Sequence, residues 1–213
     1  IRDVYKRQAM VNFVEEGENI AIIVSGVFGG KFKDIAERYN YNVHVYNVEW
    51  ERAVDPVAFK DFLATIDNVS AVFTQACETS TSVLHPLNAL GKVVKDYNAQ
   101  TLFVVDAVSA LGGADINMKR DDIDVLVSGS QKALMLPPGL AFVGINDLSY
   151  EKLNQASDKR YYLDLRMYLK SLEDDYTPQT PAVTLYQGLD DVLEMIEEEG
   201  LEAIFSRHKK CSR

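Results

Sequence analysis

The chain has 213 residues, of which 47% are hydrophobic, and it carries a formal net charge of -10. This charge argues against nucleic acid or an anionic membrane surface as a partner, and no apolar run reaches the roughly 20 residues of a membrane span. Cys77 and Cys211 are too few for a disulfide framework and indicate a reducing, cytoplasmic compartment. The hydrophobic content is sufficient for one domain with a large core.

The first eight residues, IRDVYKRQ, differ from the rest of the chain. They show no hydrophobic period and resemble a string that arises when sequencing-adapter DNA is translated. We therefore expect residues 1–8 to be a non-native leader and exclude them from the fold prediction.

The first half of the chain alternates apolar runs with helical spacing. The predicted strands are Ile20–Val24, Val43–Tyr46 and Val69–Phe73. The predicted helices are Phe28–Tyr39 and the segment from Pro56 to Ile66, which Asp55 caps. Gly26, Gly29 and Gly30 lie between the first strand and its helix and give only a weak signal for phosphate binding.

The second half continues the alternation. His85 and Pro86 open a helix that reaches Tyr97, and apolar strands follow at 102–105, 123–127 and 140–145. Ser149 is expected to cap a helix, Tyr161–Leu172 to form another, and an amphipathic helix from Leu185 to end at Gly200. The acidic residues from Asp190 to Glu202 are typical of a solvated helix face. This order predicts an α/β fold with a largely parallel sheet and functional loops at the carboxyl ends of its strands.

Two charged residues follow buried strands. Asp106 closes the run Leu102–Val105, and an ionised carboxylate there needs a cationic partner because burying it alone costs several kcal/mol. Lys132 lies in a small-residue turn before Pro137, Pro138 and Gly139. Ser128, Ser130 and Gln131 flank it with side chains suited to phosphate. The pattern favours a lysine that forms an imine with a carbonyl cofactor, and Asp106 would pair with a pyridinium nitrogen.

The stretches VVDAVSALGG and DIDVLVSGSQKALMLPPG together resemble the class V aminotransferases, which are fold-type I pyridoxal-phosphate enzymes, and are most similar to the alanine–glyoxylate and serine–pyruvate group. The resemblance begins near Ala9. It implies a three-layer αβα large domain whose mostly parallel sheet contains one antiparallel strand, namely residues 140–145. It also implies that Lys132 and Asp106 are catalytic and that pyridoxal 5'-phosphate is the cofactor.

The same resemblance assigns further contacts to the cofactor. Gln131 is implied as a phosphate ligand, Val108 as the residue on one face of the ring, Phe28 as the stacking residue on the other, and Thr79 as the hydroxyl near the phenolic oxygen. In the family, the stretch matching Tyr176 to Thr180 reaches across a homodimer interface toward the neighbouring phosphate, although a plain extended linker also explains its composition.

Relatives in this family are longer than this chain. The resemblance therefore implies an internal fragment, in which residues 9–200 form an incomplete cofactor-binding domain and residues 201–213 begin a missing C-terminal domain. The arginine that binds the substrate carboxylate belongs to that missing part, so the fragment is expected to be inactive. Ile204 and Phe205 are expected to lack cover.

The leading functional hypothesis is an aminotransferase that moves an amino group from a small amino acid to a 2-oxo acid such as glyoxylate or pyruvate. A cysteine desulfurase or related lyase is one alternative, but those enzymes have histidine where this chain has Gln131. A noncatalytic α/β domain is another alternative, and under it the occurrence of both Asp106 and Lys132 with their flanking motifs would be a coincidence.

Cys77 is expected to be a small buried hydrophobe. His44, His85 and His208 show neither metal-ligand spacing nor a Ser-His-Asp arrangement, so no metal is expected.

Overall fold

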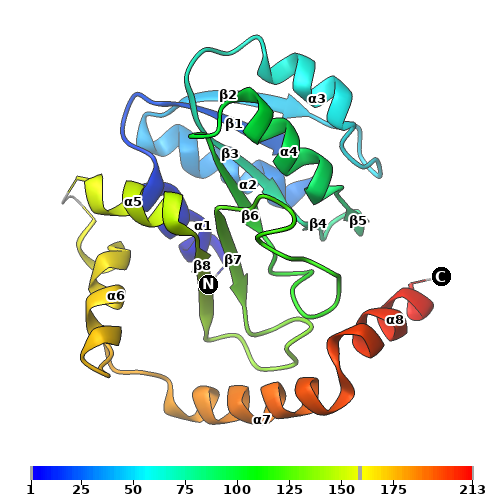
Figure 1. Ribbon diagram of the computed structural model, residues 1–213, viewed down its shortest axis with the longest axis vertical. Coiled ribbons are helices and arrows are strands. Elements are labelled where there is room, and N and C mark those ends of the chain that lie inside the picture. The colour runs from blue at the N-terminus through cyan, green and yellow to red at the C-terminus, as the bar shows by residue number, and fades with distance from the viewer. Residues whose placement is uncertain (1, 158–159, 213) are drawn as a thin grey trace.

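The computed structural model describes residues 2–157 and 160–212 (Figure 1). A six-stranded sheet runs through the centre in the order β2-β1-β3-β6-β7-β8. The strands are β1 (Asn19–Val24), β2 (Asn42–Asn47), β3 (Val69–Gln75), β6 (Leu102–Asp106), β7 (Val125–Gly129) and β8 (Ala141–Ile145). Among these six described strands, only β8 pairs antiparallel with its neighbour. The predicted fold class and the antiparallel strand are confirmed.

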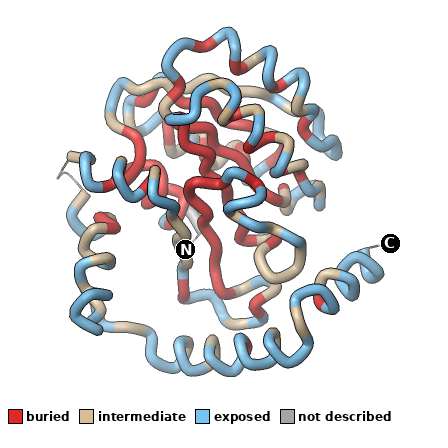
Figure 2. The backbone as a smooth tube through the Cα atoms, in the orientation of Figure 1, coloured by how far each residue is buried: buried red, intermediate tan, exposed pale blue. Residues whose placement is uncertain are grey.

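Helices cover both faces of the sheet. On one face lie α1 (Arg2–Phe13), α2 (Val27–Ala36) with the 3-10 turn η1 (Glu37–Tyr39), α5 (Asp147–Gln155) and α6 (Leu165–Glu173). On the other face lie α3 (Pro56–Leu63) and α4 (Leu87–Tyr97). Each layer encloses its own cluster of buried apolar side chains, and the central strands are the most deeply buried part of the backbone (Figure 2). The result is a three-layer αβα arrangement.

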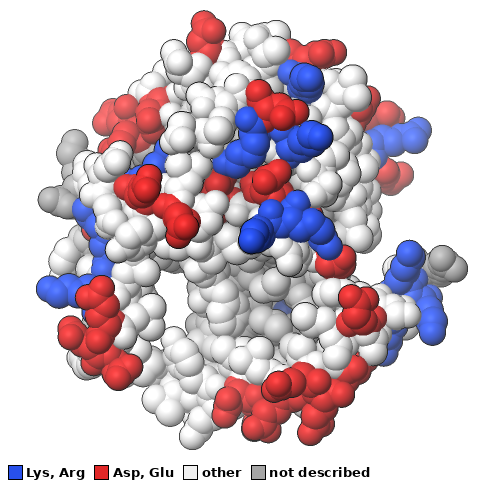
Figure 3. All heavy atoms as spheres, in the orientation of Figure 1, with Lys and Arg blue, Asp and Glu red and all other residues white. Residues whose placement is uncertain are grey.

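The last two helices extend along the outside of this unit. They are α7 (Val183–Glu199) and α8 (Leu201–Cys211), and the chain bends between them at Gly200, where φ is 80°. Acidic side chains gather along α7 and face solvent, as predicted (Figure 3). The expectation that Ile204 and Phe205 lack cover is wrong. Because α8 turns back toward the core, Ile204 is buried and Phe205 half-buried.

Three local expectations also need correction. Residues 2–8 were expected to lie outside the fold, but they form the first turns of α1, in which Tyr5 and Lys6 are buried; their non-native origin stays a prediction. Asn146, not Ser149, caps α5, because Ser149 occupies the third helical position and completes a capping box with it. The single helix expected over Tyr161–Leu172 is divided at Asp164, whose carboxylate caps α6 and separates it from a 3-10 turn, η2 (Tyr161–Leu163).

Within the described residues, none of the helices combines the length and the apolar character needed to cross a membrane.

Candidate functional site

The candidate residues lie at the carboxyl edge of the sheet. Asp106 is the last residue of β6 and is in register with Gln75 on β3 and Val127 on β7. A short hairpin, β4 (Cys77–Glu78) with β5 (Val83–Leu84), follows β3 at the same edge. Lys132 follows β7 in a turn. Parallel strands bring their carboxyl ends together, so residues distant in sequence meet here.

The Asp106 carboxylate is buried and already has a cationic partner. Its Oδ1 accepts a hydrogen bond from the Val108 amide at 2.9 Å, and its Oδ2 lies 2.9 Å from the Lys6 Nζ. Lys6 is only 1% exposed and also donates to the Phe28 carbonyl at 2.6 Å. The sequence correctly required a cation at Asp106. It missed Lys6 as that cation because residues 1–8 were left out of the fold prediction.

Phe28, Val108 and Thr79 lie around this ion pair. The Lys6 Nζ is 5.7 Å from the centroid of the Phe28 ring, so Phe28 and Asp106 approach the same amine. The Thr79 Oγ1 forms a 2.5 Å hydrogen bond with the Oγ of Ser109, the residue after Val108. The structure therefore brings Phe28, Thr79, Asp106 and Val108 together, and their roles toward a cofactor stay predictions.

The lysine turn is held by its own hydrogen bonds. The Ser130 Oγ donates to the Pro137 carbonyl at 2.7 Å and accepts from the Leu140 amide at 3.3 Å. The Met135 amide donates to the Lys132 carbonyl. The Lys132 side chain is exposed. Because the Ser130 hydroxyl is already used within the turn, the interpretation of Ser130 as a phosphate donor loses its support.

The Cys77 thiol connects the lysine turn electrostatically to Asp106. Burial raises the pKa of Cys77, the carboxylates of Glu78 and Asp106 raise it further, and the Lys132 ammonium lowers it. A thiol with a raised pKa is a weak nucleophile. Cys77 packs against the apolar cluster, but it is half-buried and not fully buried as expected.

The stretch from Tyr176 to Thr180 lies apart from these residues. It connects α6 to α7, and the side chains of Tyr176 and Thr180 are both exposed. The role predicted for them, a contact with a neighbouring subunit's cofactor, stays a prediction.

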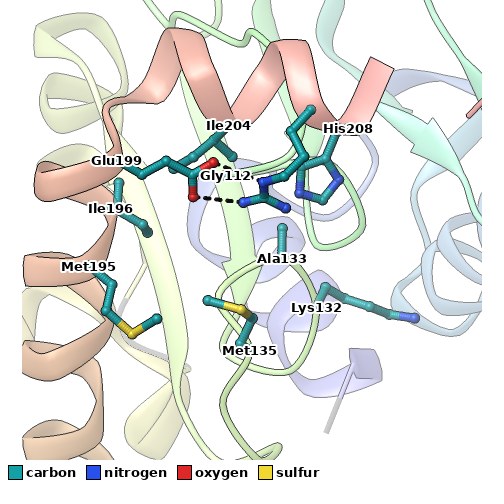
Figure 4. Close-up of a pocket in the computed structure, with 10 residues that line it drawn as sticks. Gly112, Lys132, Ala133, Met135, Met195, Ile196, Glu199, Ile204 and His208 are labelled. Carbon is teal, nitrogen blue, oxygen red and sulfur yellow. Dashed lines mark hydrogen bonds and ion pairs between the residues drawn. The ribbon is translucent and has the colours of Figure 1, made fainter. Parts of the chain in front are cut away.

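A cavity of about 200 Å³ lies on the outer side of the lysine turn. Figure 4 shows Met135, Met195, Ile196 and Ile204 around it, with the Lys132 amine directed away from the two methionines. Arg207 also lines the cavity, and its Nε and Nη2 donate to the Glu199 carboxylate at 2.8 Å. Asp106, Thr79 and Phe28 do not line the cavity, so it is separate from the cluster around Asp106.

Sequence reasoning gave no site role to two buried polar side chains. Gln75 lies beside Asp106, and neither its Oε1 nor its Nε2 has a hydrogen-bond partner among the described residues. His85 was expected to start a helix, but α4 begins at Leu87 and His85 is buried before it. The sequence did contain a signal that Gln75 belongs to the site, because Gln75 is the last residue of β3 just as Asp106 is the last residue of β6. It contained no comparable signal for His85.

His85 joins two loops at this edge. Its Nδ1 accepts from the Val54 amide at 3.3 Å, which leaves the Nε2 to donate to the Ser25 Oγ at 2.8 Å. Burial lowers the pKa of His85 to about 4, although the nearby Glu78 carboxylate opposes the shift. His85 is therefore neutral at pH 7 and serves as a structural link between the two loops.

No group of three or more His, Cys, Asp or Glu side chains suited to a metal ion occurs in the described part of the chain.

Comparison with known proteins gives a consistent result. The profile of the family described as aminotransferase class-V matches residues 7–213. An uncharacterized aminotransferase of Methanocaldococcus jannaschii is 38% identical over 96% of this chain and 53% of its own length. A serine–glyoxylate aminotransferase of Arabidopsis thaliana is 31% identical over 96% of this chain and 52% of its own length. The crystal structure of an alanine–glyoxylate aminotransferase from Nostoc sp. superposes with a TM-score of 0.89 at 29% identity, covering 98% of this chain and 55% of the other. The chain thus spans about half the length of the curated relatives it matches.

Proposed function

Because this chain belongs to the class-V aminotransferase family, we propose that it is the cofactor-binding part of an aminotransferase that moves an amino group from a small amino acid to a 2-oxo acid such as glyoxylate or pyruvate. The observation that carries the proposal is the meeting of a buried Asp106, an aromatic Phe28 and the Thr79 hydroxyl at the sheet edge from which Lys132 extends. Family membership implies pyridoxal 5'-phosphate as the cofactor.

The residues at this edge fit that cofactor. The Asp106 carboxylate accommodates a cation at its Oδ2, as the Lys6 ammonium demonstrates. The buried Ser128 Oγ and Gln131 Oε1 have no hydrogen-bond partner among the described residues, so they are available to a bound polar group. Polar atoms buried without partners are uncommon in native proteins and often mark a ligand or a water.

Each side chain has a distinct task in the proposed reaction. When bound, pyridoxal phosphate supplies an aldehyde and a ring that withdraws electrons from the substrate's Cα. Asp106 holds a proton on the ring nitrogen because a protonated nitrogen offsets the buried negative charge of its carboxylate. The Lys132 Nζ would hold the aldehyde group and, as a free amine, would accept the proton from the substrate's Cα. Phe28 and Val108 pack on the ring, and Thr79 and Gln131 provide polar contacts.

The assembly and the location are part of the proposal. We expect the complete protein to be a cytoplasmic homodimer, with Tyr176 and Thr180 contacting the partner subunit's cofactor. Support comes from the exposure of both side chains on a connecting segment and from Cys77 and Cys211, which are both free. Nothing in the acidic surface favours nucleic acid as a partner.

A trapping experiment tests the assignment of Lys132. The chain is incubated with pyridoxal phosphate, reduced with borohydride to fix the covalent link, and digested for peptide mass mapping. We expect the cofactor mass on Lys132 at concentrations that leave the exposed Lys92 on α4 unmodified. Lys132→Ala removes that label, whereas Lys92→Ala does not. Equal labelling of the two lysines would contradict the proposal, because a noncatalytic domain reacts only through its exposed amines.

A further inference from the structure

The Glu78 carboxylate lies inside the molecule with hydrogen bonds from two separate loops. Its side chain is fully buried. From its own loop it accepts the Ser80 amide at 3.1 Å and the Ser80 Oγ at 2.7 Å. From the start of α2, about 50 residues earlier, it accepts the Phe28 amide at 3.1 Å and the Gly29 amide at 3.0 Å. Glu78 therefore ties the loop that carries Thr79 to the helix that carries Phe28.

The start of α2 depends on this carboxylate. The residue at the N-cap position is Gly26, which has no side chain to cap the helix. The Val27 amide donates to the Ser80 Oγ at 3.1 Å, so the first three amides of α2 are all satisfied by residues 78–80. Free amides at a helix start attract anions, and here the anion is a carboxylate of the chain itself. The sequence signal for phosphate binding at Gly26–Gly30 is thus explained by Glu78.

Gly26 gives independent evidence that this contact is built into the fold. A Cβ at position 26 would lie 2.5 Å from the Ser80 Oγ and 2.6 Å from the Glu78 Cγ. These separations are far below van der Waals contact, so any larger residue would push the carboxylate away from α2. The close approach of the two loops requires glycine here.

Electrostatics indicate that Glu78 is ionised in the folded protein. Burial alone would raise the pKa of Glu78, but the Ser80 hydroxyl and the amides of Ser80, Gly29 and Phe28 together hold the pKa below its ordinary value. A carboxylate that accepts several hydrogen bonds keeps its charge even when buried.

We infer that Glu78 is a positioning residue, which fixes Phe28 and Thr79 relative to each other so that both contact the same cofactor ring. The inference rests on the proposed function, because Phe28 and Thr79 matter only if that ring binds between them. Glu78 itself touches Phe28, Gly29 and Ser80 and acts through them. Thr79 lies between Glu78 and Ser80 in the chain, and its hydroxyl bonds to Ser109 in the loop that follows β6.

The test compares Glu78→Gln with the unaltered chain by two measurements. The first is amide hydrogen exchange without cofactor, and we expect the Phe28 and Gly29 amides to exchange roughly tenfold faster, because a glutamine accepts at one atom only and a hydrogen bond to a charged group is the stronger one. The second is pyridoxal phosphate affinity by absorbance titration, which we expect to fall by roughly tenfold. Gly26→Ala, which keeps the charge but displaces it, should reproduce both effects.

Two controls separate positioning from stability. Glu49→Gln, at an exposed site, should change neither measurement. Val94→Ala, buried on α4 in the opposite layer, should lower the melting temperature while leaving cofactor affinity unchanged. Unchanged exchange at Phe28 and Gly29 in Glu78→Gln would overturn the inference, as would an equal loss of affinity in Val94→Ala. If the unaltered chain binds no cofactor at all, the proposed function fails, and exchange alone decides whether Glu78 holds the two loops.

Discussion

At the residue scale, Asp106, the residue proposed to hold the cofactor's ring nitrogen, is paired with Lys6. The two side chains form a buried ion pair that also includes the Phe28 carbonyl and the Phe32 ring, whose centroid is 4.1 Å from the amine. A protonated ring nitrogen at Asp106 would compete with Lys6 for the same carboxylate. We therefore expect removal of Lys6 to destabilise the cofactor-free chain and to strengthen its binding of the cofactor.

This competition predicts the behaviour of Lys6→Met. The variant should lose about 3 kcal/mol or more of stability without cofactor, because Asp106 is left as an unpaired buried charge. It should bind pyridoxal phosphate more tightly than the unaltered chain, and its melting temperature should rise more on adding the cofactor. Thermal melts and absorbance titrations measure both effects.

Lys33→Met is the matched control, since Lys33 is an exposed lysine of α2 that pairs with Glu37 on the surface. It should change stability by less than about 1 kcal/mol and leave cofactor affinity as it was. Equal affinity in Lys6→Met and the unaltered chain would show that the amine and the ring nitrogen do not compete.

His85 predicts a specific dependence of stability on pH. The pKa of His85 falls from 6.5 in the unfolded chain to about 4 in the folded protein because of burial. Between these values the unfolded state takes up a proton that the folded state does not, so stability falls as the pH is lowered. The loss should reach about 2 kcal/mol by pH 5.

Urea unfolding at pH 7 and pH 5 measures this effect. His85→Gln retains a donor for Ser25 but does not titrate, so its stability should change less over the same interval. If the free energy of unfolding of His85→Gln falls as much between pH 7 and pH 5 as that of the unaltered chain, other titrating groups cause the effect.

At the scale of elements, the lysine turn is the segment whose shape depends most on one side chain. Ser130 joins the two ends of the turn through its bonds to Pro137 and Leu140. Ser130 directly follows β7 and Leu140 directly precedes β8, so the hydroxyl also connects the ends of these two antiparallel strands. The local sequence identified the turn, but only the tertiary structure showed that Ser130 holds it together and does not face a ligand.

Ser130→Ala should therefore lower the free energy of unfolding by about 1 to 2 kcal/mol, because it leaves a buried amide without its acceptor. Urea unfolding gives this value directly. Ser206→Ala, at an exposed position on α8, should change it by less than about 0.5 kcal/mol. If both variants unfold at the same urea concentration, the Ser130 hydroxyl is not what holds the turn.

At the scale of the whole molecule, the described chain is an αβα core with an extended C-terminal segment. The relatives it matches are about twice as long. Leu193, Met195 and Leu201 on α7 and α8 are about half exposed, which is an unusual amount of apolar side chain at one end of a domain. Arg207, which lines the outer cavity together with Lys132, is neutralised by Glu199.

These features predict that the 213-residue chain alone is a poor catalyst. Because Lys6 already occupies the Asp106 carboxylate and Arg207 in the outer cavity is paired with Glu199, transamination should be slower than in a full-length relative by a factor of about 10² or more. The measurement is keto acid formation from alanine or serine with glyoxylate, at saturating pyridoxal phosphate. A rate similar to that of a full-length serine–glyoxylate aminotransferase would show that the chain carries a complete site.

The antiparallel last strand was implied by the family resemblance. The sequence by itself determined most of the order of strands and helices and the placement of Lys132 and Asp106 after apolar strands. These features follow from local periodicity and from the rule that parallel strands end at one edge. Only the tertiary structure decided which partners those residues have. The pairing of Asp106 with Lys6 and the capping of α2 by Glu78 join residues far apart in the chain, and the neutral state of His85 depends on burial. Such contacts are created by folding, and no spacing along the chain encodes them.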